Sequence, residues 1–294
     1  MRPSLSQLER RAQKHGHRRV GNWLARRVAR PVALRVTWIV APWGVSAHAV
    51  TLVATITALA AAAAFGLGNV GGWILGAMLL QLWYLLDHVD GQLARLNETA
   101  SLDGTTLDYL MHHTVTMSVP LGIGMGLFSR TCEAWWLVVG MAWSVAWTLV
   151  GLRNDARYKA YFQRLKLVDG ALLVMGRANR APMPTNAPKR HALATAWWLA
   201  RKACEAHVAL CVLTAVAVAQ WLSGDENLWL ARIALASQAL VAFGVAAAAL
   251  ARDTSRGEAE RDFANWFRPR PCESLVFEDG RYRVVSDSTV ARGR

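Results

Sequence analysis

Four aspartates and three histidines lie within one short stretch of the chain, DHVDGQLARLNETASLDGTTLDYLMHH, residues 87 to 113. Asp87 and Asp90 are three residues apart, so a helix would present both carboxylates on one face. Asp108 and His112 are four residues apart, which places them on one face of a second helix. Carboxylates and imidazoles bind divalent cations and accept protons. If the two helices face each other, the stretch predicts a divalent-cation site at the carboxylates of Asp87, Asp90 and Asp108, beside the imidazole of His112.

Residues with little side-chain bulk accompany these acids. Gly91 and Ala94 continue the face of the first two acids, and Gly104 lies four residues before Asp108. If the two helices face each other, the small residues leave room for a nucleotide, and Arg95 can pair with a phosphate. Metal ions in such a site would hold a diphosphate and neutralise developing charge. The pattern favours transfer chemistry at phosphorus.

Apolar segments on both sides of the acids are long enough to cross a membrane. Residues 46 to 66 contain no Lys, Arg, Asp or Glu, and a helix of that length spans the hydrocarbon core of about 30 Å. Similar segments recur along the chain, which is 54% hydrophobic and contains 14 Trp. The sequence predicts an all-α fold, an integral membrane bundle of six transmembrane helices. The predicted spans are residues 46–66, 70–90, 107–129, 132–152, 203–222 and 227–250.

Basic residues predict the orientation of these spans. Most Lys and Arg lie in residues 1–35, 153–202 and 251–294, and basic segments are retained on the cytoplasmic side during insertion. With six spans, this distribution places both termini and the acid-bearing loop, residues 91–106, in the cytoplasm. We therefore expect a multi-pass protein of the cell (inner or plasma) membrane whose site faces the cytoplasm.

The net charge of +13 would also suit a nucleic-acid-binding protein. The basic residues, however, flank apolar segments and do not form one face of a soluble module. Attraction to anionic lipid headgroups, at about 1 kcal/mol per basic residue, explains them more simply. We expect anionic membrane lipids as partners and no nucleic acid.

An amphipathic pattern precedes the first span. In residues 20 to 32, Val20, Trp23 and Val28 lie at helical spacing until Pro31 interrupts the pattern. This predicts an N-terminal amphipathic helix in the membrane interface. An ordinary basic flank that serves only topology is the alternative.

Composition divides the chain into three parts. Residues 1–45 form a cytoplasmic, basic and interfacial segment, and residues 251–294 form a cytoplasmic C-terminal tail. Residues 46–250 form a six-helix transmembrane catalytic domain that includes the cytoplasmic loop 153–202. The first half of that loop predicts an interfacial helix or an extension of the fourth span. In the tail, Asp279-Gly280 between two short apolar runs predicts a hairpin.

The third predicted span carries three residues that affect helix packing. Gly122 and Gly126 form a GxxxG spacing, which predicts close approach of a neighbouring helix. Pro120, in the same segment, predicts a kink.

Seven of these residues match a known signature. The string Asp87-x2-Asp90-Gly91-x2-Ala94-Arg95-x8-Gly104-x3-Asp108 resembles that of the CDP-alcohol phosphotransferases, also called CDP-alcohol phosphatidyltransferases. The family pattern ends with three further residues and a fourth Asp, where this chain has His112. The resemblance in motif covers residues 87–112, and the predicted architecture agrees with the family over residues 20–250.

The resemblance implies a fold, an activity and a set of site residues. A phospho-alcohol (phosphatidyl-type) group would pass from a CDP-linked alcohol to a hydroxyl acceptor with release of CMP, as in phospholipid or related lipid and head-group biosynthesis. Two divalent ions, Mg²⁺ or Mn²⁺, and a homodimer are also implied. By position, the metal ligands would be Asp87, Asp90, Asp108 and His112. The residues around the CDP group would be Asp87, Gly91, Ala94, Arg95 and Gly104, and the catalytic residues would be Asp108 and His112.

The replacement of an acid by His112 predicts altered chemistry. A neutral imidazole suits proton abstraction near pH 7, and it can instead bind a metal through one nitrogen. Removal of one negative charge predicts that the second cation is held less tightly and that this second site prefers Mn²⁺. The alternative is that the chain is a catalytically inactive relative that acts as a scaffold.

Other polar residues near the motif receive structural roles. Asp103 is interpreted as a helix cap, and His88 and His113 as interfacial or packing residues. His48 lies where the family often has a Pro-Asn-x-x-Thr element. Only Thr51 of that element is present, so we assign no substrate role to His48.

The identity of the substrates stays open in the sequence. One reading is a CDP-diacylglycerol donor with a small polar acceptor, and the other is a soluble CDP-alcohol with a lipid acceptor. Basic residues after the fourth span, Arg153, Arg157 and Lys159, are candidates for binding a phosphorylated acceptor, although a solvated flank explains them too. From a different class of protein, a divalent-cation transporter would use the same acids but would need polar residues deeper in several spans.

Overall fold

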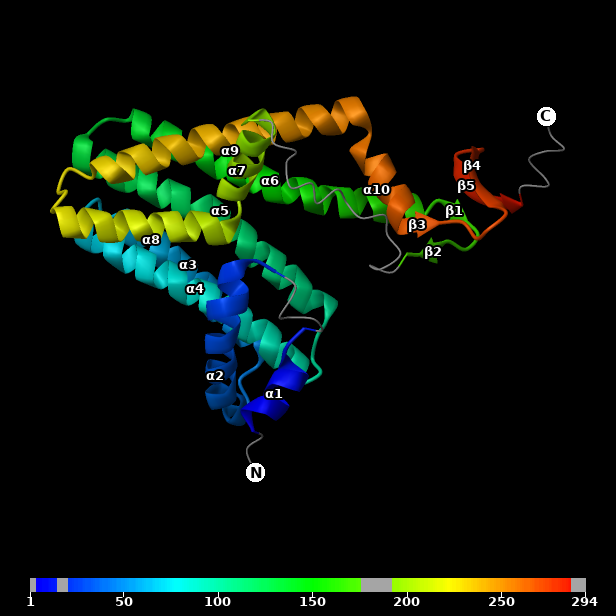
Figure 1. Ribbon diagram of the computed structural model, residues 1–294, viewed down its shortest axis with the longest axis horizontal. Helices are drawn as coiled ribbons and strands as arrows, with labels where there is room; N and C mark the ends of the chain where they lie inside the picture. The colour runs from blue at the N-terminus through cyan, green and yellow to red at the C-terminus, as the bar shows by residue number, and fades with distance from the viewer. Residues whose placement is uncertain (1–3, 15–20, 176–191, 287–294) are drawn as a thin grey trace. The chain divides into compact units, whose positions relative to one another are not determined.

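The structure is a computed structural model, and it describes residues 4–14, 21–175 and 192–286. The described chain is mostly helical, with short strands in residues 168–174 and in the C-terminal tail (Figure 1). The helices are α1 (Leu5–Ala12), η1 (Ala25–Ala29, a π-helix), α2 (Arg30–Val40), η2 (Ala41–Trp43, a 3₁₀-helix), α3 (Ala47–Phe65), α4 (Val70–Leu96), α5 (Leu102–Thr131), α6 (Trp135–Leu165), α7 (Ala192–Ala203), α8 (Ala206–Ser223), α9 (Trp229–Arg256) and α10 (Glu258–Trp266). The strands are β1 (Val168–Asp169), β2 (Leu173–Val174), β3 (Phe267–Arg268), β4 (Glu273–Glu278) and β5 (Arg281–Ser286).

Five helices of the described chain are long and apolar enough to cross a membrane: α3, α4, α6, α8 and α9. They coincide with five of the six predicted spans. Helix α5 covers the predicted third span as one continuous helix of 30 residues. The N-terminal half of α5 carries the polar part of the motif. For this reason α5 is less apolar than the five helices above and is not counted among them. A membrane protein of helical class is therefore supported, whereas the sixth span stays a prediction.

The chain forms two compact units. The first comprises Met1–Thr148 and Leu199–Gly244, and the second comprises Leu149–Trp198 and Val245–Arg294. The acid-bearing motif belongs to the first unit. The second unit brings together the loop after the fourth span and the C-terminal tail, which are far apart in sequence.

Close helix packing organises the first unit, in which α3 packs extensively against both α4 and α5. A Cβ atom added to Gly122 would lie 2.1 Å from the carbonyl oxygen of Ala62, and one added to Gly126 would lie 2.2 Å from that of Phe65. Only glycine permits this approach of two backbones. The prediction from the GxxxG spacing is confirmed. Helix α5 continues through Pro120, and the kink expected at that residue stays a prediction.

The N-terminal segment differs from its prediction at Pro31. We expected the helix to stop there, but a π-helical turn, η1, leads directly into α2. Proline lacks an N–H and clashes with the carbonyl four residues earlier in a regular helix, and the wider turn relieves that clash. Whether this helix lies in the membrane interface stays a prediction.

Buried polar contacts join α2 to α4. The hydroxyl of Thr37 donates to Oε1 of Gln92 at 2.9 Å, and Nε2 of Gln92 donates to the carbonyl of Arg30 at 3.3 Å. Ala33, Val89 and Leu93 pack beside them in an apolar cluster. These contacts fix the rotation of α4, and therefore the direction of its acidic face.

The second unit contains the predicted tail hairpin. Strands β4 and β5 pair in antiparallel fashion around Asp279 and Gly280, both of which have positive φ, 51° and 77°. These angles suit the two-residue turn that this dipeptide favours. The hairpin prediction is confirmed. In addition, β1 pairs in parallel with β5, and β2 pairs with β3.

Two Gly→Ala variants test the packing of α5. Gly122→Ala would force the added Cβ into the Ala62 carbonyl, so we expect a loss of about 1 to 3 kcal/mol in unfolding free energy. Gly244→Ala is the control because no atom of the described residues lies within 4 Å of its added Cβ. We expect this variant to be neutral or more stable by up to about 1 kcal/mol. Thermal unfolding in one detergent measures both, and equal stability of the two variants would contradict the packing described for α5.

Candidate functional site

The motif lies on the facing ends of α4 and α5. A turn of residues 97–101 joins them, and Ser101 begins α5 as its N-cap, because its hydroxyl accepts a hydrogen bond from the N–H of Gly104 at 3.0 Å. The interpretation of Asp103 as the cap is wrong. Asp103 lies in the first turn of α5 instead, where a negative charge suits the helix dipole.

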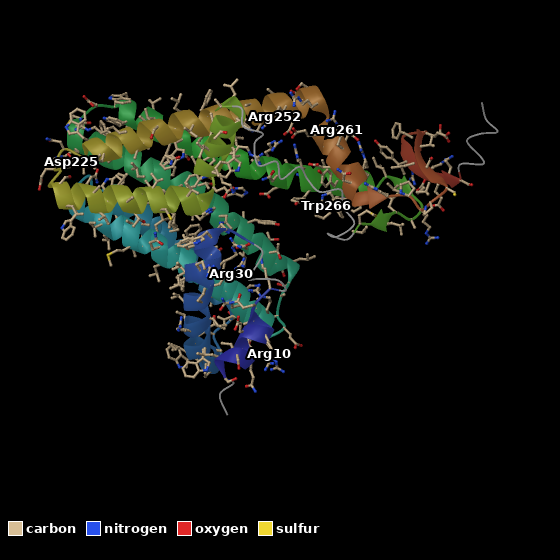
Figure 2. All side chains as sticks on the ribbon, viewed as in Figure 1. Arg10, Arg30, Asp225, Arg252, Arg261 and Trp266 are labelled. Atoms are coloured by element: carbon tan, nitrogen blue, oxygen red, sulfur yellow. The ribbon has the colours of Figure 1, made fainter. Side chains whose placement is uncertain are left out.

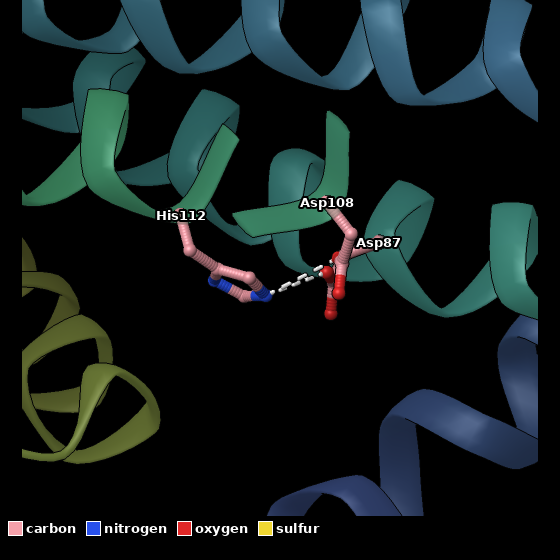
Figure 3. Close-up of side chains that lie close together, drawn as sticks. All are labelled: Asp87, Asp108 and His112. Carbon is pink, nitrogen blue, oxygen red and sulfur yellow. Dashed lines mark ion pairs between the residues drawn. The ribbon is translucent and has the colours of Figure 1, made fainter. Parts of the chain in front are cut away.

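Three predicted site residues gather at one point. Nε2 of His112 lies 3.1 Å from Oδ1 of Asp87 and 3.5 Å from Oδ1 of Asp108. Figure 3 shows the imidazole of His112 directed at the two carboxylates. Asp87 comes from α4, whereas Asp108 and His112 lie one turn apart on α5. The predicted polar faces of the two helices therefore do meet.

Asp90, the fourth predicted ligand, is held differently. It is buried, its Oδ2 accepts a hydrogen bond from the hydroxyl of Thr51 at 2.7 Å, and its Oδ1 accepts one from the N–H of Gly91. Asp90 is not part of the tight three-residue cluster. A carboxylate that already accepts two hydrogen bonds is fixed in direction and still has lone pairs for a cation.

A cavity of about 400 Å³ surrounds these groups. Every residue of the sequence motif contributes to its wall, so the cavity and the motif coincide. The motif residues that line it are Asp87, Asp90, Gly91, Ala94, Arg95, Gly104, Asp108 and His112.

The small residues in the wall have specific neighbours. A Cβ on Gly104 would lie 3.2 Å from Nε2 of His48, and one on Gly91 would lie 3.3 Å from Nη1 of Arg95. Nε of Arg95 also donates to the carbonyl of Ala12 at 2.6 Å. Glycine at these two positions thus gives space to a ring and to a guanidinium that face the cavity.

Some lining residues were not predicted as site residues. His88, interpreted as an interfacial or packing residue, lines the cavity, and its Nδ1 lies 3.4 Å from Oδ2 of Asp87. His48 and Thr51 line it as well. The match of Thr51 to the family element was the one signal that pointed to the start of α3. The segment before α3 also contributes, and nothing in its sequence indicated this role.

The cluster fits a divalent cation. One ligand atom from each of Asp87, Asp108 and His112 lies within 4.8 Å of the others. Oxygen ligands suit Mg²⁺ and Mn²⁺, and an imidazole nitrogen is better suited to Mn²⁺ than to Mg²⁺. The donor set is therefore compatible with the predicted Mg²⁺ or Mn²⁺.

Apolar helices long enough to cross a membrane, together with an acidic cavity between two helices, define the class of this protein. Comparison with known protein families identifies its family. The model of the CDP-alcohol phosphatidyltransferase family matches residues 44–200. The chain belongs to this family, and the predicted resemblance is confirmed. A search of curated proteins found no match.

The three candidates for acceptor binding lie on α6 in the second unit. Two of them are already ion-paired. Arg153 contacts Asp253 and Glu258, and Arg157 contacts these two acids and Asp262. Lys159 is exposed. The role of these three residues in binding an acceptor stays a prediction, and the ion pairs give the two arginines a structural role beside it.

A neighbouring ion pair belongs to the same contact between α6 and the tail. Both terminal nitrogens of Arg164 donate to the carboxylate of Glu260, on α10, and this contact lowers the pKa of Glu260. The guanidinium also lies over the rings of Phe263 and Tyr282, 5.0 and 4.9 Å from their centroids. Arginines of α6 thus bind acids and aromatic rings of the tail.

Replacing Arg157 tests the structural role. Arg157→Gln removes the cation that contacts all three acids and leaves Arg153 to pair with Asp253 and Glu258 only, so we expect a loss of about 1.5 to 3 kcal/mol in the stability of the second unit. Limited proteolysis of the purified protein would then cleave the tail, residues 251–294, at least tenfold faster. Lys159→Gln, an exposed position on the same helix, is the control. Equal cleavage of the two variants would contradict the structural role of Arg157.

Proposed function

We propose that this protein is a membrane enzyme that transfers a phospho-alcohol group from a CDP-linked alcohol to a hydroxyl acceptor and releases CMP. The observation that carries the proposal is that every motif residue lines one cavity. Family membership supports a phosphotransferase of this type. The particular donor and acceptor are part of the proposal, and one of the two is a lipid.

The proposed reaction is a substitution at phosphorus. The acceptor hydroxyl oxygen forms a bond to the phosphorus attached to the alcohol, the bond from that phosphorus to the CMP oxygen breaks, and CMP leaves with its electron pair. The hydroxyl proton passes to a base of the cavity. Bound Mg²⁺ or Mn²⁺ would neutralise the charge on the diphosphate. Asp87, Asp90 and Asp108 would hold the cations, and Gly91, Ala94, Arg95 and Gly104 would surround the CDP group.

His112 has two proposed roles, as base and as metal ligand. Its Nε2 faces the Asp87 and Asp108 carboxylates, which supports a ligand role for that nitrogen. The ring then replaces a fourth carboxylate, with one negative charge fewer, so the second cation binds less tightly. As base, the ring would take the proton through a nitrogen that carries no cation.

The location of the reaction follows from the apolar helices and the basic segments. We propose a multi-pass protein of the cell membrane with both termini and the cavity on the cytoplasmic side, in the lipid or head-group biosynthesis that the family implies. The five apolar helices support membrane insertion, and the distribution of Lys and Arg supports the orientation. The homodimer, the six spans and the three-part division of the chain remain part of the same proposal.

The first test is the metal-dependent release of CMP. Purified protein in lipid vesicles is incubated with Mg²⁺ or Mn²⁺, a panel of CDP-lipids and CDP-alcohols, and acceptors. We expect CMP from one pair, and we expect Asp108→Asn to lower its rate at least 100-fold because a cation ligand is lost. Asp103→Asn, an acid on the same helix that does not line the cavity, is the control. Release of no CMP from any pair would leave the scaffold or transporter alternatives.

The second test separates the roles of His112. We expect His112→Ala to lower the rate by about 10² to 10⁴, the range of a lost general base, and His113→Ala to have little effect. We expect His112→Asp to retain activity and to shift the preference from Mn²⁺ toward Mg²⁺, because an oxygen ligand replaces nitrogen. Full activity of the alanine variant would show that His112 has no catalytic role.

A further inference from the structure

The chain before the first span is docked against the motif. In α1, Leu8 and Ala12 are buried, and α1 packs against both α2 and α4. At its C-terminal end, the carbonyl of Ala12 accepts the hydrogen bond from Nε of Arg95. A residue of the motif therefore holds the end of α1 at the cavity.

The segment that leads into η1 and α2 is attached to α4 as well. Nδ2 of Asn22 donates to the hydroxyl of Tyr84 at 3.2 Å. The carbonyl of Arg30 accepts hydrogen bonds from Nε2 of Gln92 at 3.3 Å and from Nε2 of Gln13 at 3.5 Å. The backbone at Arg30 is thus attached both to α4 and to the end of α1.

This docking brings two cationic side chains to the cavity. Lys14, two residues after α1, and Arg30, at the first position of α2, both belong to its wall. Arg30 is labelled near the N-terminal end of α2 in Figure 2. Its guanidinium lies beside Gly21, where an added Cβ would be 2.7 Å from Nη2 and where φ is +103°. Glycine at this position lets the backbone pass close to the guanidinium.

The wall of the cavity therefore carries charges of both signs. Asp87, Asp90 and Asp108 supply negative charge, and Lys14 and Arg30 supply positive charge in addition to Arg95. Carboxylates with a bound cation attract a phosphate from one side, and ammonium or guanidinium groups donate to its oxygens from another. The family match begins at residue 44, so Lys14 and Arg30 lie in a part of the chain that the family model does not cover.

We propose that Lys14 and Arg30 form an anion subsite of the cavity that binds a phosphate group of a substrate. This inference rests on the proposed function for the identity of that substrate. The phosphate belongs either to the diphosphate of the CDP-linked donor or to a phosphorylated acceptor. Both sources offer the same chemistry, a dianionic or monoanionic phosphate with oxygens that accept from Lys and Arg.

A basic flank that only attracts anionic lipid is the competing explanation. The same segment provides matched controls: Arg10 on α1, labelled in Figure 2, and Arg27 in η1 are both exposed and do not line the cavity. Replacing Arg10 or Arg27 removes one positive charge from the N-terminal segment, as replacing Lys14 or Arg30 does. An effect on lipid attraction would be shared by all four positions, whereas an effect on the subsite belongs to Lys14 and Arg30 alone.

The experiment measures ligand binding by the full chain in vesicles of uncharged phosphatidylcholine with Mg²⁺. Titration calorimetry gives the dissociation constant of CDP, and then that of inorganic phosphate with CDP present at saturation. The variants are Lys14→Gln and Arg30→Gln, with Arg10→Gln and Arg27→Gln as controls, and thermal unfolding checks that each is folded. Lys14 is exposed, so its variant tests the subsite even if Arg30→Gln does not fold.

We expect the two subsite variants to bind one probe at least tenfold more weakly than the controls do. Weaker CDP binding assigns the subsite to the donor, and weaker phosphate binding with unchanged CDP binding assigns it to the acceptor. Binding of both probes within twofold of the controls overturns the subsite. CMP release distinguishes the two proposals: tenfold weaker binding without CMP from any pair refutes only the function, and CMP release with unchanged binding refutes only the subsite.

Discussion

Repulsion between two carboxylates is the interaction on which this site depends. Asp87 and Asp108 come within 4.8 Å of each other through their ligand atoms, and two unit charges at that separation repel by about 3 to 4 kcal/mol at an effective dielectric constant of about 20. The imidazole nitrogen of His112 lies against both. A cation in the same position would relieve the repulsion more fully. The arrangement is costly without positive charge, and this cost is the physical reason to expect that the acids bind metal.

The packing of the first unit holds the acids in this costly arrangement. Helix α3 approaches α5 closely at Gly122 and Gly126, and the buried Thr37–Gln92 pair fixes α4 against α2. Because these contacts lie on the helices that carry the acids, the backbones of α4 and α5 cannot move away from their neighbours without breaking them. The hydrogen bond from Thr51 to Asp90 adds a direct link from α3 to the acidic face. The packing of the helices thus positions the acids of the site, and a substitution that changes this packing also changes the site.

Much of this site was predictable because its information is local. Spacings of three and four residues within one helix placed Asp87 with Asp90 and Asp108 with His112 on common faces, and the structure adds that the faces meet. Capping was less predictable, since Ser101 and Asp103 both belong to residue types that cap helices well and helix ends are uncertain by one or two residues. The passage of the helix through Pro31 required a π-turn that has no clear sequence signal. By contrast, the dipeptide Asp279-Gly280 was enough to predict the hairpin.

Contacts between distant segments were not predictable from one sequence. Arg157 meets acids about 100 positions later in the chain, and a basic helix gives no indication of which acids will pair with it. The same holds for Lys14 and Arg30, whose position depends on a main-chain carbonyl at the end of α1 that accepts from Arg95. Any residue at position 12 would present that carbonyl, so side-chain identity carries no signal there. Residues of the N-terminal segment therefore become part of the cavity wall through backbone geometry, and basic residues that look alike in sequence, such as Arg27 and Arg30, differ in whether they reach it.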